Sequence, residues 1–90
     1  MAHFARVIDG VVVDVHVLAN PVITDSDGIE QESLGQAFLA ALWGYAPSEL
    51  IQCSYNGNFR GAYPGVGWSY DSVADVFVAP EPAEVPDEVG

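Results

Sequence analysis

A polar loop with alternating acids is the segment of this chain best suited to bind a metal ion. Residues 25–28 read Asp-Ser-Asp-Gly, and Glu30 and Glu32 follow closely. Carboxylates separated by one residue can converge on a hard cation such as calcium. The EF-hand pattern is not met, because that loop needs a further ligand before the glycine and a bidentate acid at a fixed distance after it. We therefore expect no metal here, and expect Ser26 or Asp27 to cap the following helix.

The thiol and imidazole side chains are isolated from one another in the sequence. Cys53 is the single cysteine and has no basic neighbour, and His3 and His16 belong to no nucleophile motif. Zinc needs three or four protein ligands, which two histidines in neighbouring strands do not supply. We expect a buried structural thiol, two histidines at the surface or rim of the domain, and no catalytic residue, metal ion or cofactor.

The glycine-rich stretch at residues 60–67 is not a phosphate-binding loop. No helix pattern follows it, and it lacks the lysine and hydroxyl pair of a P-loop. Around it lie six aromatic residues, Tyr55, Phe59, Tyr63, Trp68, Tyr70 and Phe77. Such a set can form a stacking platform for sugars or bases, but in a small β domain it more often fills the core, which is what we expect.

The composition indicates one small acidic domain. Ninety residues, of which 50% are hydrophobic, suffice for one modest core. Thirteen acids stand against two basic residues, Arg6 and Arg60, for a formal charge of −11. Nucleic acid and anionic membranes are poor partners, because phosphate groups are bound by cations. We favour ion pairs of Arg6 and Arg60 within the domain over contacts with acidic groups of a partner.

The first expected element is a β-hairpin. Residues 4–8 and 11–18 are β-branched runs on either side of Asp9 and Gly10. A two-residue turn would place Arg6 on the same face as the odd-numbered valines, whereas a three-residue loop with Gly10 left-handed in a bulge would not. We expect the three-residue loop. It places Ala5, Val7, Val11, Val13, Val15 and Val17 on the core face, and Arg6, Val12, Asp14 and His16 on the other.

A helix is expected from about Glu30 to Trp43. Gly44 and Pro47 end it, because glycine suits a left-handed cap and proline cannot continue a helix. Its apolar residues recur at helical spacing, which predicts one buried stripe. The stripe consists of Leu34, Phe38, Ala41, Leu42 and Tyr45.

Two further hairpins are expected in the second half of the chain. Residues 50–55 lead through Asn56 and Gly57 into a returning strand at 58–60, since Asn-Gly is a strong hairpin signal. Residues 68–70 and 76–78 lie on either side of a polar turn. The predicted fold class is therefore α+β, a small domain rich in antiparallel β-hairpins with one α-helix.

The last residues form an expected tail. Residues 80–90 contain three prolines, four acids and no aromatic residue, which is unsuited to a sheet or a core. We expect a compact domain at residues 1–79 and an extended acidic tail at 80–90, either solvated or laid along a neighbouring subunit.

Several blocks of the chain together resemble small proteins of tailed bacteriophages of the marine and cyanobacterial type. They are residues 1–7 (Met-Ala-His-Phe-Ala-Arg-Val), 41–44 (Ala-Leu-Trp-Gly), 51–60 (Ile-Gln-Cys-Ser-Tyr-Asn-Gly-Asn-Phe-Arg) and 65–71 (Gly-Val-Gly-Trp-Ser-Tyr-Asp), with Phe77 and Pro80. The resemblance runs in order up to about Pro82, and no catalytic motif is among its residues. It implies a virion protein.

The resemblance and the composition together predict a non-enzymatic structural accessory protein of the virion. We expect a capsid decoration or cement protein on the outer shell, with the major capsid protein as partner and a homo-oligomer as a possibility. Free hairpin edges and the tail would provide contacts. The candidate interface residues are Arg6, Arg60, Tyr63, Trp68, Pro80 and Pro82. Two alternatives stay open: a tail or tail-fibre component or its assembly chaperone, and a small carbohydrate- or calcium-binding module.

Overall fold

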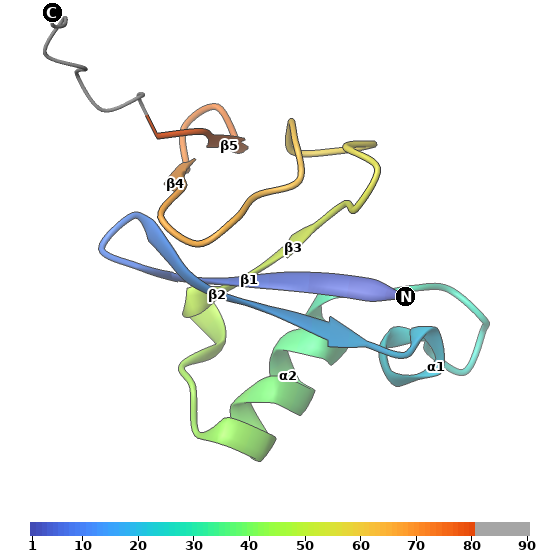
Figure 1. Ribbon diagram of the computed structural model, residues 1–90. Coiled ribbons are helices and arrows are strands. Elements are labelled where there is room, and N and C mark those ends of the chain that lie inside the picture. Colours follow the sequence, from blue (N-terminus) through green and yellow to red (C-terminus); the bar gives the residue numbers. More distant parts are fainter. Residues whose placement is uncertain (81–90) are drawn as a thin grey trace, which may run out of the picture.

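The fold is an antiparallel sheet with helices on one face and the segment of residues 54–68 on the other (Figure 1). The computed structural model describes residues 1–80. The strands are β1 (Ala2–Ile8), β2 (Val11–Leu18), β3 (Leu50–Cys53), β4 (Ser69–Asp71) and β5 (Val76–Val78), in the spatial order β3-β1-β2-β4-β5. The helices are α1 (Asn20–Ile23), α2 (Glu32–Trp43) and the 3-10 turn η1 (Pro47–Glu49). The expected α+β class is confirmed, with α1 as an additional single turn.

The first hairpin has a two-residue turn, so the expected three-residue loop is wrong. Ile8 pairs with Val11, and both Asp9 (φ 52°) and Gly10 (φ 80°) are left-handed. Two left-handed residues in succession give the type I′ turn, whose twist matches that of the flanking strands. Aspartate tolerates this conformation better than most residues, which is why Asp-Gly closes the hairpin without a bulge at Gly10.

A bulge does occur further along the hairpin, at Val13. Arg6 pairs with Asp14 but Val7 pairs with Val12, which leaves Val13 as the extra residue. The bulge changes the alternation of side chains along β2. The expected core face is therefore wrong for Val11 and Val13, which are exposed, and for Val12, which is fully buried. Val17 lies beyond the bulge on the same face as Val15, but its side chain is exposed. Ala5, Val7 and Val15 do lie on one face, as expected.

Strand alternation places a separate core on each face of the sheet. On the helix side the buried residues are Ala2, Phe4, Leu18, Ile23, Leu39 and Leu50. On the opposite side they are Ala5, Val12, Cys53 and Phe77, with Tyr63, Trp68 and Tyr70 packed against them. Phe4 and Ala5 are neighbours in β1 and belong to different cores, because successive side chains of a strand point to opposite faces.

Helix α2 ends as the sequence predicts, and part of the expected stripe is confirmed, since Leu34 and Tyr45 pack against the core. Gly44 is left-handed (φ 75°) and its N–H bonds to the Ala40 carbonyl. The buried positions are Gly35 and Leu39, whereas Phe38 and Leu42 of the predicted stripe are exposed. Gly35 lies against the ring of Phe4, so the helix approaches β1 most closely there.

The expected hairpin at Asn56 and Gly57 does not form. Gly57 N–H closes a turn onto the Ser54 carbonyl, and the Ser54 hydroxyl accepts the Asn58 N–H at 2.9 Å, but β3 pairs only with β1 in residues 1–80. The chain then crosses the sheet and forms the last expected hairpin, β4 with β5, which is confirmed. The second hairpin fails because side chains occupy the outer edge of β3, as described below.

The last strand, β5, ends at Val78, and residue 80 is the last that the structure describes. The boundary between a compact domain and a tail at residue 80 stays a prediction. Pro80 follows β5 and is exposed. The expectations for residues 81–90, including an extended course and a contact by Pro82, lie outside the described part of the chain.

Candidate functional site

Arg6 is paired inside the domain. Its Nε donates to Glu49 Oε1 at 3.1 Å, and its guanidinium carbon lies 4.0 Å from the centre of the Tyr45 ring. A guanidinium over an aromatic face is favourable because the ring's electron density attracts the cation. Arg6 therefore joins β1 to η1 and to the segment that follows α2.

Arg60 makes a larger set of internal contacts. Its two terminal nitrogens bond to the two carboxylate oxygens of Glu32, at 2.6 and 3.2 Å, and its Nε donates to Asp75 at 2.8 Å. The bonds to Glu32, followed by those to Asp75, raise the pKa of Arg60. Both arginines thus pair with acids of the domain, as we favoured from the sequence.

The same network covers the outer edge of β3. Glu32 accepts the Gln52 N–H at 2.7 Å, and Arg60 donates to the Gln52 carbonyl at 2.8 Å. Gln36 donates to the Leu50 carbonyl at 2.7 Å. Three outward-pointing backbone groups of β3 are therefore bonded to side chains, and this edge is not free to pair with another strand.

Hydrogen bonds to the carboxylate of Asp25 hold the acidic loop together. Asp25 Oδ1 accepts the N–H groups of Asp27 and Ile29, both at 2.9 Å, and Oδ2 accepts the Gln31 side-chain amide at 3.1 Å. The Ile29 N–H and the Gln31 amide are the main reasons why the pKa of Asp25 is lowered. Asp25 thus closes the loop, and the expected capping of α2 by Ser26 or Asp27 is wrong, since the helix begins later, at Glu32. Within residues 1–80 no group of three metal-binding side chains comes together.

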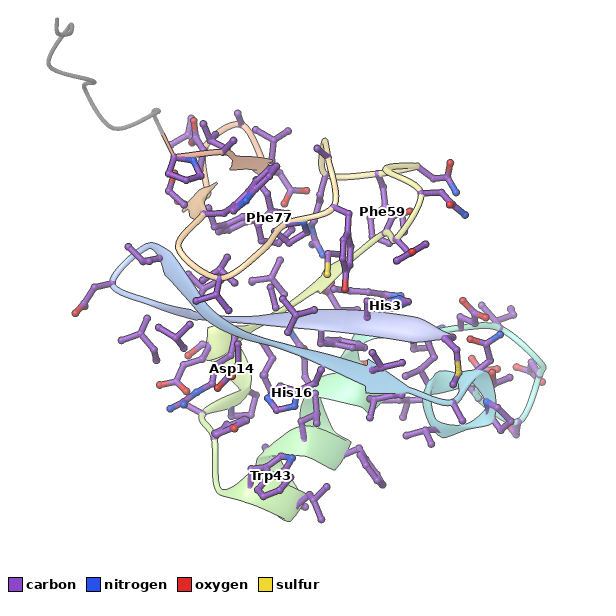
Figure 2. The ribbon with its side chains drawn as sticks, viewed as in Figure 1. His3, Asp14, His16, Trp43, Phe59 and Phe77 are labelled. Carbon is purple, nitrogen blue, oxygen red and sulfur yellow. The ribbon has the colours of Figure 1, made fainter. Side chains whose placement is uncertain are left out.

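The two histidines lie on opposite faces of the sheet, each among aromatic rings. His3 stacks on Tyr55, and its ring centre is 5.3 Å from that of Tyr63. His16 lies on the helix side, 6.3 Å from Trp43 and 5.5 Å from Tyr45, and its Nε2 is buried without a partner in residues 1–80. Figure 2 shows His16 on β2 above Trp43, and His3 on the far side of the sheet from α2.

The expected aromatic core is confirmed for four of its six residues and wrong for Tyr55 and Phe59, which are exposed. The thiol lies within this core. Tyr63, Trp68, Tyr70 and Phe77 pack on the face opposite the helices. Cys53 is 2% exposed, and burial raises its pKa to about 12.

The interface candidates named from the sequence do not form one surface. Arg6 is on the helix side of the sheet, whereas Tyr63 and Trp68 pack in the opposite core. Arg60 lies at the β3 edge, and Pro80 follows β5.

The structure brings together one aromatic cluster instead, and it exposes several large apolar side chains of α2. The Tyr55 cluster consists of His3, Tyr55 and Tyr63 on the face opposite the helices, and its Tyr55 ring is 66% exposed.

On α2, Phe38, Leu42 and Trp43 are 42%, 57% and 58% exposed. Phe38 and Leu42 are four positions apart and lie on one side of the helix, whereas Trp43 lies beside His16 and Tyr45. Sequence reasoning assigned Phe38 and Leu42 to the core. A signal for these exposed apolar side chains was available, because residues 33–48 contain no charged side chain in a chain with thirteen acids.

Comparison of the chain with protein-family models, with curated proteins and with solved structures found no match. In residues 1–80 no helix has the length and apolar character needed to cross a bilayer.

Proposed function

We propose that this chain is a non-enzymatic structural accessory protein of a tailed phage particle, a decoration or cement protein that binds the outer surface of the major capsid protein shell. The resemblance of its sequence blocks to small phage proteins supports the phage assignment. The observation that supports binding to another protein is the Tyr55 cluster, an exposed aromatic group held in place before any partner arrives.

The geometry of the cluster favours tight contact. Tyr55 stacks on His3 with the rings 25° apart and meets Tyr63 at 5.2 Å between ring centres. A ring that is already ordered loses little conformational freedom on binding. Tyrosine is also among the residues that most often dominate binding energy at protein interfaces. The cluster is therefore a suitable anchor for a protein partner.

The role of the arginines follows from their internal pairs. Because Arg6 is bound to Glu49 and Arg60 to Glu32 and Asp75, neither is required for the contact with the shell. With the β3 edge bonded to side chains, augmentation of the sheet at that edge is also not the mode of binding. Shape and aromatic packing through Tyr55 carry the proposed contact.

The first test is quantitative mass spectrometry of purified particles of the source phage, giving the copies of this chain per copy of the major capsid protein. A ratio close to one supports decoration of the shell. A small fraction of that ratio assigns the chain to the tail, the alternative noted above. Absence from the particle contradicts a virion role.

The second test addresses the cluster directly. Full-length protein is added to shells that lack it, and the bound fraction is measured for the native chain, Tyr55→Ala and Tyr55→Phe. We expect Tyr55→Ala to weaken binding roughly tenfold, as for an interface anchor worth about 1–2 kcal/mol, and Tyr55→Phe to bind nearly as well. Equal binding of all three proteins would remove the cluster from the interface.

An exposed tyrosine ring also suits stacking against a sugar, which favours carbohydrate binding as a second candidate. A glycan array probed with the native chain and with Tyr55→Ala distinguishes the carbohydrate-binding module from the decoration protein. Glycan binding lost in Tyr55→Ala, together with absence from the particle, would support the carbohydrate module over the decoration protein.

A further inference from the structure

Both end strands of the sheet have covered outer edges within residues 1–80. At the outer edge of β3, the side chains of Glu32, Gln36 and Arg60 bond to the backbone, as described above. At the outer edge of β5, the Phe77 N–H donates to the Arg60 carbonyl, and Gly61 forms a parallel bridge with Phe77. Neither end of the sheet is therefore free to accept a further strand.

The outer side of β2 differs, because it is paired only near the hairpin turn. Strand β4 contributes the single pair of Val11 with Ser69, and Val12 exchanges two hydrogen bonds with residues 67–68. In the part of the chain that the structure describes, no strand, loop or side chain bonds to the outer side of β2 beyond that point. We call this segment, residues 13–18, the open β2 edge.

The hydrogen bonds of β3 fix the direction of the backbone groups in β1. In an antiparallel sheet, the N–H and C=O groups of successive residues point alternately to the two neighbouring strands. The groups of Gln52 point away from β1, since they bond to side chains at the outer edge. Its neighbours in β3 therefore bond to His3 and Ala5, with which they pair. Phe4 and Arg6 consequently direct their backbone groups to β2.

The same alternation leaves two residues of β2 with free backbone groups. Asp14 and His16 pair with the β1 residues that point to β2, so their N–H and C=O groups bond to β1. Those of Val15 and Val17 point the other way, to the open β2 edge. A row of unpaired N–H and C=O groups is a template for another strand. Val13 and Val17 are 37% and 52% exposed, so a strand can reach this edge.

The charges around the open β2 edge indicate the chemistry of such a strand. Asp14 is exposed and has no ion pair in residues 1–80, because Arg6, its partner in the sheet, bonds to Glu49. Asp9 and Asp71 lie at the same end of the edge, in the hairpin turn and at the end of β4. A strand with a basic side chain at this end would be attracted.

Charge also disfavours the chain itself as the occupant. A second copy carries the same formal charge of −11, which opposes its approach. Residues 81–90 contain four acids and no basic residue, and Pro82 and Pro86 have no N–H group for a ladder of hydrogen bonds. A segment of a different protein fits the edge better.

We propose that the open β2 edge binds an extended segment of another protein, which adds to the sheet antiparallel to β2 and carries a lysine or arginine opposite Asp14. Val15 and Val17 lie on the face opposite the helices, where β-branched residues of the segment pack beside them. Asp14 and His16 lie on the helix side, as Figure 2 shows. Main-chain bonds supply the affinity of such a strand, and its alternate side chains supply specificity. This inference does not depend on the proposed phage function, and the Tyr55 cluster does not use this edge.

Amide hydrogen exchange of the full chain, followed by NMR, tests whether the edge is open. We expect the N–H groups of Val15 and Val17 to exchange roughly tenfold faster, or more, than that of His16, which bonds to β1. Slow exchange of both groups in the free chain would overturn the proposal, because the edge would already be occupied. Protection that disappears on dilution would then identify a second copy as the occupant.

A five-residue peptide serves as the probe strand. In acetyl-Thr-Val-Thr-Val-Lys-amide, aligned antiparallel, the two valines lie opposite Val17 and Val15 and the lysine lies opposite Asp14. NMR titration of the full chain measures its binding. Because so short a strand buries far less than a standard interface, we expect a dissociation constant on the order of 0.1 mM. The N–H groups of Val15 and Val17 should become protected in the complex.

Two altered peptides distinguish main-chain pairing from charge. N-methylation of both valines removes the N–H groups that face β2, and we expect binding to be lost. Replacement of the lysine by glutamate should weaken binding roughly threefold or more, and the difference should shrink at high salt because the ion pair is exposed. In Asp14→Asn the preference for the lysine peptide should decrease.

Val17→Pro and Val17→Thr form the matched comparison on the chain. Proline removes an N–H that bonds to nothing in residues 1–80, so the fold should be kept while the peptide no longer binds. Threonine keeps this N–H and the β-branched shape, and the variant should bind the peptide about as tightly as the native chain. If circular dichroism shows that Val17→Pro is unfolded, the N-methylated peptide decides the matter.

Three binding results would also overturn the proposal. The first is no binding of the lysine peptide up to about ten times the expected dissociation constant. The second is equal binding of the N-methylated peptide, and the third is equal binding of the lysine and glutamate peptides at low salt. The capsid-binding experiment on Tyr55→Ala is read at a different surface, so its failure would leave this inference intact.

Discussion

Arg60 and Glu32 are 28 residues apart in the sequence and form a two-point ion pair that joins the first turn of α2 to the outer edge of β3. Their side chains are only 20% and 29% exposed. Two parallel bonds between a guanidinium and a carboxylate are stronger and more directional than a single contact. Through Asp75 the same guanidinium also reaches the turn between β4 and β5, so one side chain connects three segments.

Replacement of Arg60 by lysine should destabilise the fold although the charge is kept. Lysine cannot make the two-point contact with Glu32, and we expect Arg60→Lys to lower the free energy of unfolding by about 1–2 kcal/mol. Urea denaturation measures the change. Arg6→Lys is the comparison, since Arg6 makes a single bond to Glu49 and lies over the Tyr45 ring. A loss in Arg60→Lys no larger than the loss in Arg6→Lys would contradict a special stabilising role of the two-point contact.

Gly35→Ala should destabilise the protein although alanine is the better helix former. A methyl group at residue 35 would collide with the ring of Phe4 and come within 3.0 Å of Ile23 Cγ2. Overpacking of this kind costs about 1–3 kcal/mol, which exceeds the gain of about 1 kcal/mol in helix propensity. Thermal melting measures the effect. Phe4→Leu in the same chain should recover part of the loss, and no recovery would contradict a clash with that ring.

The Asp25 loop should weaken in acid. Because hydrogen bonds from Ile29 and Gln31 lower the pKa of Asp25 below its usual 3.8, the native state favours the ionised form more than the unfolded state does. The stabilisation is present above pH 3.8 and is lost as the pH falls through the lowered pKa of Asp25. Asp25→Ala should therefore lower the melting temperature at neutral pH, and the difference from the native chain should shrink in acid.

Asp27→Ala is the control for the loop, since Asp27 donates its backbone N–H to Asp25. Its melting temperature should stay closer to that of the native chain at neutral pH. A chelator added to the native protein should leave the melting temperature unchanged, because the Asp25 carboxylate already bonds to the loop. A change in the melting temperature on adding calcium would contradict this account.

Cys53 should be inert in the folded protein. Burial raises its pKa from 9.0 to about 12, so almost no thiolate is present near neutral pH. A disulfide reagent should react only after urea is added. The unfolded thiol ionises at lower pH than the native one, so the free energy of unfolding falls as the pH rises above 9.0. The free energy of unfolding of Cys53→Ala should fall less steeply over the same range. Rapid reaction of the native thiol would contradict its burial.

Much of the local structure was predictable from the sequence because its signals act between near neighbours. Asp9 and Gly10 mark the first turn, Gly44 marks the end of α2, and the polar residues between β4 and β5 mark the last hairpin. The charge composition also favoured internal partners for both arginines, because acids outnumber them so heavily.

The tertiary structure alone decided the register of β2 on β1, the covering of the outer edge of β3 and the face that α2 exposes. Val12 is buried because a bulge at Val13 aligns β2 with β1, and the Asn56 turn forms no hairpin because Glu32, Gln36 and Arg60 occupy the β3 edge. Helix α2 packs on the sheet through Gly35 and Leu39, and Phe38 and Leu42 are left exposed. Each outcome depends on contacts between residues distant in sequence, which local pattern and propensity do not encode.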